Sequence, residues 1–180
     1  MQKETIKKIE NLIIYFFIFS LIGWIAEILY AIKVEGTFVK RGFLYGPICP
    51  IYGFGAIMLI TINNFINRHT KSNIIKFVIF SIIFTVFEYL VSLVFELIFN
   101  IRWWNYSNEL LNLNGRICLM FSIIWGIAGI LFINHAYMPI KNKIETLQKK
   151  IPNYYVHIFV IICTTGSIVD CVLSSIKYLK

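Results

Sequence analysis

The chain has 180 residues, of which 58% are hydrophobic and only 14% charged, and its formal net charge is +8 at pH 7. The charged share lies well below the roughly 25% of soluble domains, and the mean hydropathy is +0.74. A soluble protein of this composition would expose too much apolar surface to stay dispersed. The basic residues lie in short connections between apolar runs, so we expect no basic face for nucleic acid. The composition indicates a single integral membrane domain with the lipid bilayer as its main partner.

Five apolar runs follow one another, each long enough to cross about 30 Å of hydrocarbon. The predicted spans are residues 12–32, 47–66, 74–99, 117–138 and 154–177. No small-residue cleavage pattern follows the first run, so we expect it to be retained. The second run opens with Pro47 and Pro50, which suit either a helix N-terminus or a short re-entrant stretch. The predicted fold is all-α, a polytopic transmembrane bundle of about five helices.

The predicted connections, at residues 33–46, 67–73, 100–116 and 139–153, are too short to form separate domains. Lys and Arg concentrate on the cytoplasmic side of membrane proteins. The side with the N-terminal tail has ten of them, including Lys3, and the other side has seven, including Lys180. This excess predicts a multi-pass protein of the cell membrane with a cytoplasmic N-terminus and an external C-terminus.

The sequence contains no pattern typical of a metal site or of a nucleotide-hydrolysing site. Neither the four cysteines nor the three histidines have the spacing of metal ligands. GxxxxGK[ST], GxSxG and HExxH are all absent. We therefore expect no metal and no cofactor, and any ATP hydrolysis would have to come from a separate subunit.

Four carboxylates lie inside predicted spans: Glu27, Glu88, Glu96 and Asp170. An ionisable group at membrane depth costs several kcal/mol unless it is paired, neutralised or hydrated, so such residues mark functional sites by default. Glu27, Glu88 and Asp170 each lie about 21–24 Å along their helices. Because these three helices start on the same side, the sequence predicts that the three carboxylates share one layer, with Glu96 nearer the external end.

Small and polar residues recur at spacings of three and four, which places them on one face of each helix. The stripes are Ser20, Gly23, Glu27 and Ala31; Ser81, Thr85, Glu88, Ser92 and Glu96; Ser122, Gly126 and Gly129; and Cys163, Ser167, Asp170, Ser174 and Lys177. Small residues allow helices to approach closely, and hydroxyl groups can hydrogen-bond across the contact. We expect these stripes to face one another.

Arginine and tryptophan side chains lie in the connections on the predicted external side. They are Arg41, Arg102, Arg116, Trp103 and Trp104. Arginine can bind a carboxylate or a phosphate through two hydrogen bonds, so these residues and the carboxylate layer predict a polar pocket in the external half of the bilayer. Two simpler interpretations stand beside this one: Glu–Arg pairs that only hold helices together, and tryptophans that form an interfacial belt.

Several motifs resemble those of one family of small bacterial membrane proteins. The first connection runs into the next helix as EGTFVKRGFLYGPICPIYGFG at residues 35–55, and the third reads RWWNYS at 102–107 and NLNGRIC at 112–118. With Gly23-Trp24-x-x-Glu27 and Glu88-Tyr89, these motifs resemble the ABC-transporter type IV (CmpB-like) permeases. The resemblance covers roughly residues 15–138 and leaves the last predicted helix outside.

The resemblance implies the membrane half of an ATP-driven transporter, with a separate cytoplasmic ATPase as partner. It implies roles at the matching positions, which are Trp24, Glu27, Arg41, Gly42, Tyr45, Pro47, Pro50, Glu88, Trp103, Trp104, Tyr106, Asn114 and Arg116. Asn105 departs from the family pattern, in which this position is usually Asp, so an acid–base role there is not expected. The short cytoplasmic connections lack the coupling helices typical of ABC permeases.

The leading hypothesis is an ABC transporter permease or another transport-related subunit of unknown substrate. Its pocket candidates are Glu27, Glu88, Asp170, Glu96, Arg41, Arg102, Arg116, Asn105, Trp24, Trp103, Trp104, Tyr45, Tyr106 and Asn114. The alternatives are a membrane-embedded enzyme acting on a lipid or lipid-linked group, and a non-catalytic assembly subunit. The sequence leaves the oligomeric state open, a homo-oligomer included.

Overall fold

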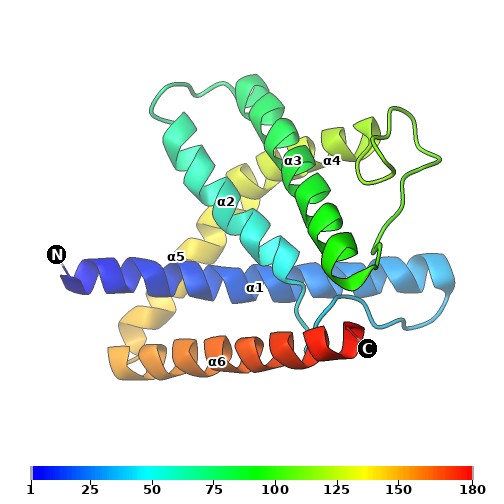
Figure 1. Cartoon of the computed structure of the whole chain (residues 1–180). Coiled ribbons are helices and arrows are strands. Elements are labelled where there is room, and N and C mark those ends of the chain that lie inside the picture. Colours follow the sequence, from blue (N-terminus) through cyan, green and yellow to red (C-terminus); the bar gives the residue numbers. More distant parts are fainter. Residues whose placement is uncertain (1, 180) are drawn as a thin grey trace. The chain divides into compact units, whose positions relative to one another are not determined.

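The computed structural model describes residues 2–179, and within this range it is all-helical, as predicted. The helices are α1 (Gln2–Glu35), α2 (Pro50–Ile66), α3 (Asn73–Phe99), α4 (Leu119–Leu131), α5 (Tyr137–Lys150) and α6 (Asn153–Tyr178), labelled in Figure 1. A π-helical segment, Phe132–Ala136, joins α4 directly to α5. The described chain therefore contains five continuous helical rods. Lys180, which contributes to the predicted orientation, lies outside the described residues.

Four of these rods are long and apolar enough to cross a membrane: α1, α3, the continuous helix from α4 through α5, and α6. The fifth, α2, has 17 residues, about 26 Å of helix against roughly 30 Å of hydrocarbon. The chain is not helical from Pro47 to Cys49, and α2 begins at Pro50, where the missing proline N–H costs no helical hydrogen bond. The helix in the predicted span at 47–66 therefore begins later than expected, at Pro50.

Two helices extend beyond the apolar runs that predict them. α1 begins at Gln2 rather than at residue 12, and α5 continues to Lys150. Residues 139–150, expected as part of a connection, are therefore helical. The added turns are rich in Lys, Glu and Gln. These are good helix formers, but they contribute nothing to an apolar pattern.

The described chain divides into two compact units. The first comprises the residues up to Met58 together with Glu145–Tyr178, and so contains α1, the start of α2 and α6. The second is Leu59–Ile144, with the end of α2, α3, α4 and the start of α5. The single domain expected from the sequence stays a prediction.

In the first unit, glycines allow α1 and α2 to meet closely. A Cβ atom on Gly53 would lie 2.2 Å from the Ser20 hydroxyl, and one on Gly23 would lie 2.2 Å from the Tyr52 ring. The backbone N–H of Cys49 donates to the Ser20 carbonyl at 3.0 Å, just before α2 begins. The small-residue stripe of α1 therefore packs against α2, while Glu10 and His157 form a contact between α1 and α6.

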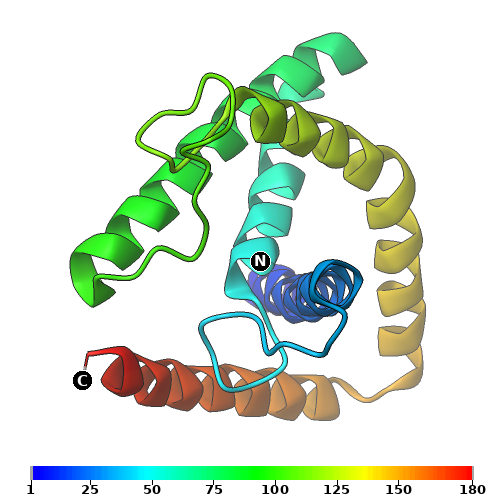
Figure 2. The same cartoon turned by 90° about the vertical axis from the view of Figure 1, so that its right-hand side faces the viewer.

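In the second unit, α3 and α4 pack through the stripes that the sequence predicts. The Thr85 hydroxyl donates to the Ser122 hydroxyl at 2.7 Å, and a Cβ atom on Gly126 would lie 2.0 Å from the Ser81 hydroxyl. Figure 2 shows the helix turning where α4 passes through the π segment into α5. An apolar cluster lies beside this contact: Leu59, Ile66, Phe80 and Ile133.

We predict that Gly126→Ala destabilises the protein by about 1–3 kcal/mol, because the added methyl group overpacks the contact between α3 and α4. Thermal unfolding in detergent, followed by helical circular dichroism, measures the effect. Gly166→Ala is the matched control, because a Cβ atom at this helical glycine meets nothing within 4 Å. Equal unfolding temperatures for the two variants would contradict the packing described above.

Candidate functional site

The connection at residues 100–118, in the second unit, has a fixed backbone conformation. The N–H of Tyr106 donates to the carbonyl of Gly115 at 2.8 Å, and the N–H of Leu113 donates to the carbonyl of Ile117 at 3.0 Å. Between these bonds the chain turns through Asn114 and Gly115, whose φ angles are 53° and 67°. Glycine and asparagine tolerate this left-handed region better than other residues. The backbone of this connection is therefore ordered, and it holds polar side chains at defined positions.

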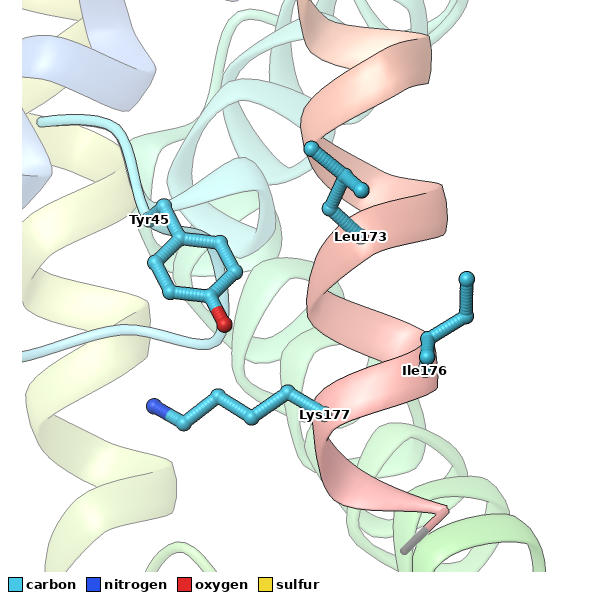
Figure 3. Close-up of a pocket in the computed structure, with 4 residues that line it drawn as sticks. All are labelled: Tyr45, Leu173, Ile176 and Lys177. Atoms are coloured by element: carbon cyan, nitrogen blue, oxygen red, sulfur yellow. The ribbon is translucent and has the colours of Figure 1, made fainter.

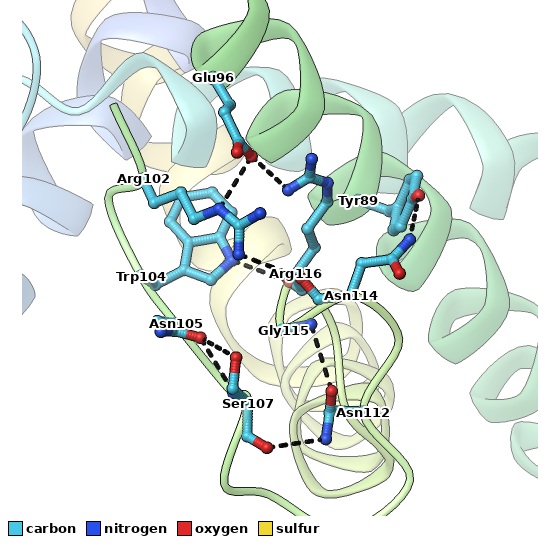
Figure 4. Close-up of polar contacts among 10 residues, drawn as sticks. All are labelled: Tyr89, Glu96, Arg102, Trp104, Asn105, Ser107, Asn112, Asn114, Gly115 and Arg116. Carbon is cyan, nitrogen blue, oxygen red and sulfur yellow. Dashed lines mark hydrogen bonds and ion pairs between the residues drawn. The ribbon is translucent and has the colours of Figure 1, made fainter. Parts of the chain in front are cut away.

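Glu96 on α3 anchors this connection through two arginines (Figure 4). The Arg102 Nε atom donates to Oε2 of Glu96 at 2.9 Å, and the Arg116 Nη1 atom donates to the same oxygen at 2.5 Å. Arg116 is 8% exposed. The Trp104 indole N–H donates to the Arg116 carbonyl at 2.9 Å. The two cations balance the charge of Glu96, so this acid is a structural anchor in the second unit.

The amide of Asn114 and the ring of Tyr89 complete this contact. The Asn114 Nδ2 atom donates to the Tyr89 hydroxyl at 2.9 Å, and the Arg116 guanidinium lies 5.7 Å from the centre of the Tyr89 ring. Trp103 packs edge-on against Phe95, with 6.3 Å between ring centres. The polar and aromatic residues of the connection therefore lie against successive turns of α3.

Glu88 lies two turns before Glu96 and is only 6% exposed. Its Oε1 accepts a hydrogen bond from the Tyr106 hydroxyl at 3.1 Å, and its Oε2 accepts one from the Trp125 indole N–H at 3.2 Å. Tyr106 stacks on Phe121, with 4.5 Å between ring centres. Glu88 thus has two uncharged donors, one from the connection and one from α4, and it forms no ion pair within the described residues.

Asp170, in the first unit, is bound mainly by backbone. Its two carboxylate oxygens accept from the N–H groups of Tyr45 and Gly46 at 2.8 and 2.7 Å, and the Ser174 hydroxyl donates at 3.0 Å. A Cβ atom on Gly46 would lie 2.9 Å from the carboxylate, so glycine permits this approach. Asp170 therefore fixes the first connection to α6.

Two of the other predicted residues of the first unit, Glu27 and Arg41, have local partners. Glu27 accepts from the Tyr52 hydroxyl, and Arg41 pairs with Glu35. The Trp24 indole N–H is buried without a partner.

The Asn105 side chain stabilises the turn in the connection at 100–118. Its side-chain oxygen accepts from the Ser107 N–H at 3.0 Å and from the Ser107 hydroxyl at 2.6 Å. Both bonds need only an acceptor, which Asp also supplies. The departure from the family pattern therefore leaves the geometry of this turn intact.

The structure brings most candidates of the second unit into two hydrogen-bonded groups on the connection at 100–118. One consists of Glu88 and Tyr106, and the other of Glu96, Arg102, Trp104, Asn114 and Arg116. Because Glu88 belongs to a different unit from Glu27 and Asp170, the layer of three carboxylates stays a prediction. Sequence reasoning missed Trp125 and Tyr52 as partners of Glu88 and Glu27. Trp125 lies three residues after Ser122 and four before Gly129 of the α4 stripe, and this spacing is the signal that could have found it.

The long apolar helices, with acids inside them, define a polytopic helical membrane protein. The family model described as "Putative ABC-transporter type IV" matches residues 14–175, and the chain belongs to this family. The match extends through most of α6, so the resemblance that we placed at residues 15–138 was too short. No curated protein and no solved structure matches the chain.

We predict that Gly115→Ala loosens the connection at 100–118. The new methyl group would lie 2.5 Å from the Ser107 hydroxyl and 2.7 Å from the Asn105 oxygen, at a φ of +67°. Limited proteolysis should then cut this connection faster, by about tenfold for a loss near 1.4 kcal/mol. Gly36→Ala is the control, since it has a φ of +72° and no atom within 4 Å of the added Cβ. An unchanged rate of cleavage at residues 100–118 in Gly115→Ala would contradict a turn that requires glycine at this position.

Asn105→Asp and Asn105→Ala should differ in the same assay. The aspartate keeps both accepted hydrogen bonds, whereas alanine removes them at a cost of about 1 kcal/mol or more. We expect cleavage of the connection at the wild-type rate in Asn105→Asp and several-fold faster cleavage in Asn105→Ala. Equal rates in the two variants would show that the Asn105 oxygen does not hold the turn.

Proposed function

We propose that this protein is the membrane-embedded permease subunit of an ABC-type transporter in the bacterial plasma membrane. Membership of the family supports this function, and so do the four helices long enough to span a membrane. The sequence has no P-loop, so the ATP-hydrolysing subunit is a separate cytoplasmic protein. With a cytoplasmic N-terminus, as the Lys and Arg counts predict, the connection at 100–118 is external.

The observation that carries the proposal is the contrast between Glu88 and Glu96. The charge of Glu96 is balanced by two arginines, whereas among the described residues Glu88 is held by the Tyr106 hydroxyl and the Trp125 indole alone. A buried carboxylate without a cation is costly, and a solute that carries a positive charge or several hydrogen-bond donors would compensate it. Glu88 is therefore the group that binds the transported solute.

Tyr106 connects solute binding at Glu88 to the external side of the membrane. It lies on the external connection and donates to Glu88, while its ring stacks on Phe121 of α4. A solute that replaces the Tyr106 hydrogen bond would release this part of the connection, while the Glu96 ion pairs keep its ends in place. The wider pocket expected from helix depth, which also contains Glu27, Asp170 and Arg41, stays a prediction from the sequence.

We predict that Glu88→Gln reduces uptake at least tenfold, because the amide keeps the size of the side chain but cannot balance a charged solute. The measurement is uptake of a panel of labelled small solutes by cells that produce the protein with its native operon, with and without ATP depletion. Membrane insertion is checked by immunoblotting.

Glu109→Gln is the control, because Glu109 is an exposed acid on the same connection and forms no ion pair within the described residues. ATP-dependent uptake that is lost in Glu88→Gln and kept in Glu109→Gln supports the proposal. Uptake unchanged in Glu88→Gln would reject Glu88 as the solute site. A panel without any ATP-dependent uptake would reject the transport function itself.

A further inference from the structure

A hollow of about 390 Å³ lies in the first unit, beside the last turns of α6. Tyr45, Leu173, Ile176 and Lys177 line it. In Figure 3 the Lys177 side chain extends below the Tyr45 ring, and Leu173 and Ile176 lie along α6. The hollow thus combines a cationic end with an apolar wall, and neither of these involves Glu88 or its partners.

Contacts between the first connection and α6 fix the position of the Tyr45 ring. The N–H groups of Tyr45 and Gly46 donate to Asp170 on α6, and Phe43 stacks on Tyr178 with 5.2 Å between ring centres. These contacts tie the connection to α6 on both sides of Leu44, which is 3% exposed. The hollow is therefore formed by a fixed connection and a helix, and not by loose side chains.

Two lysine ammonium groups converge on this one ring. The Lys40 Nζ atom lies 4.8 Å from the centre of the Tyr45 ring, and the Lys177 Nζ atom lies 5.2 Å from it. Neither lysine forms an ion pair within the described residues. Arg41 is already paired with Glu35, and Asp170 accepts three hydrogen bonds from other donors. Two cations beside one ring favour a bound anion, and the nearby Asp170 carboxylate interacts with Lys40 alone of the two.

The apolar wall indicates which kind of anion fits. Leu173 and Ile176 are 53% and 50% exposed on a helix long enough to span a membrane. Lys177 lies one residue before the end of that helix, where lysine side chains reach the headgroup level of a bilayer. Basic pockets at this level beside membrane helices bind phospholipid headgroups. A free inorganic anion would use the lysines but leave the apolar wall uncovered.

We propose that Lys40 and Lys177 bind the phosphate of an anionic phospholipid whose acyl chain lies along Leu173 and Ile176. The Tyr45 ring holds each ammonium group by a cation–π contact. The site is independent of the proposed transport function, since it requires neither Glu88 nor an ATPase.

Native mass spectrometry of the full-length protein in detergent tests this site. The protein is incubated with phosphatidylglycerol or with phosphatidylcholine, and the retained lipid is counted. We expect the wild type to retain phosphatidylglycerol in preference to phosphatidylcholine. The double variant Lys40→Gln/Lys177→Gln should lose this preference, with about a thirtyfold drop in retained phosphatidylglycerol for two lysines at a membrane surface.

The control pair is Lys8→Gln/Lys149→Gln, which removes the same charge from exposed lysines elsewhere in the first unit. The double variant Lys40→Arg/Lys177→Arg should retain phosphatidylglycerol as the wild type does, because it keeps both cations. Comparing it with the Gln double variant therefore distinguishes a loss of charge from misfolding. Equal loss in the control pair and the test pair would overturn the proposal. So would displacement of phosphatidylglycerol by equimolar inorganic phosphate, because the site would then recognise a free anion and not a lipid.

Discussion

The ion pairs of Glu96 with Arg102 and Arg116 are the interaction on which the second unit depends. They fix the connection at residues 100–118 to α3 at both of its ends. With these ends fixed, and with the Tyr106 N–H bonded to the Gly115 carbonyl, the connection places the Tyr106 hydroxyl against Glu88. The cost of burying Arg116 is offset because its guanidinium has both a carboxylate and an aromatic ring as partners.

The acids of this protein illustrate three ways of stabilising a carboxylate in an apolar helix. Glu96 uses cations, Asp170 uses successive backbone N–H groups, and Glu88 uses uncharged aromatic donors. The first two arrangements saturate the carboxylate and tie a connection to a helix. Neither Asp170 nor Glu88 forms an ion pair within the described residues, and Glu88 is the more deeply buried of the two. The chemistry of the donors therefore differs from one acid to the next, although all of these acids lie in apolar helices.

Much of the fold follows from the pattern of residues, because apolar runs and small-residue stripes report directly on helix length and helix contact. The contact of Ser81, Thr85, Ser122 and Gly126 across α3 and α4 is of this kind. The helical extensions at Gln2 and Lys150 could not be seen in an apolar pattern, since polar helix formers produce them. Partners such as Trp125 and Tyr52 were also missed, because which aromatic donor reaches an acid depends on the rotation of the neighbouring helix. The relative depth of Glu27, Glu88 and Asp170 rests on helix counting alone.

The π segment between α4 and α5 changes which side of one continuous helix is buried. Gly126 and Ile144 are both buried and lie 18 residues apart, a spacing that returns to the same face after five regular α-helical turns. One π turn adds a residue, and so it rotates everything beyond Phe132–Ala136 by about 100°. The helix therefore presents one face to α3 along α4 and a different face along α5. One continuous helix can therefore pack against two different sets of neighbouring residues. Deleting one residue from the π segment would bring the buried faces of α4 and α5 onto the same side of the helix.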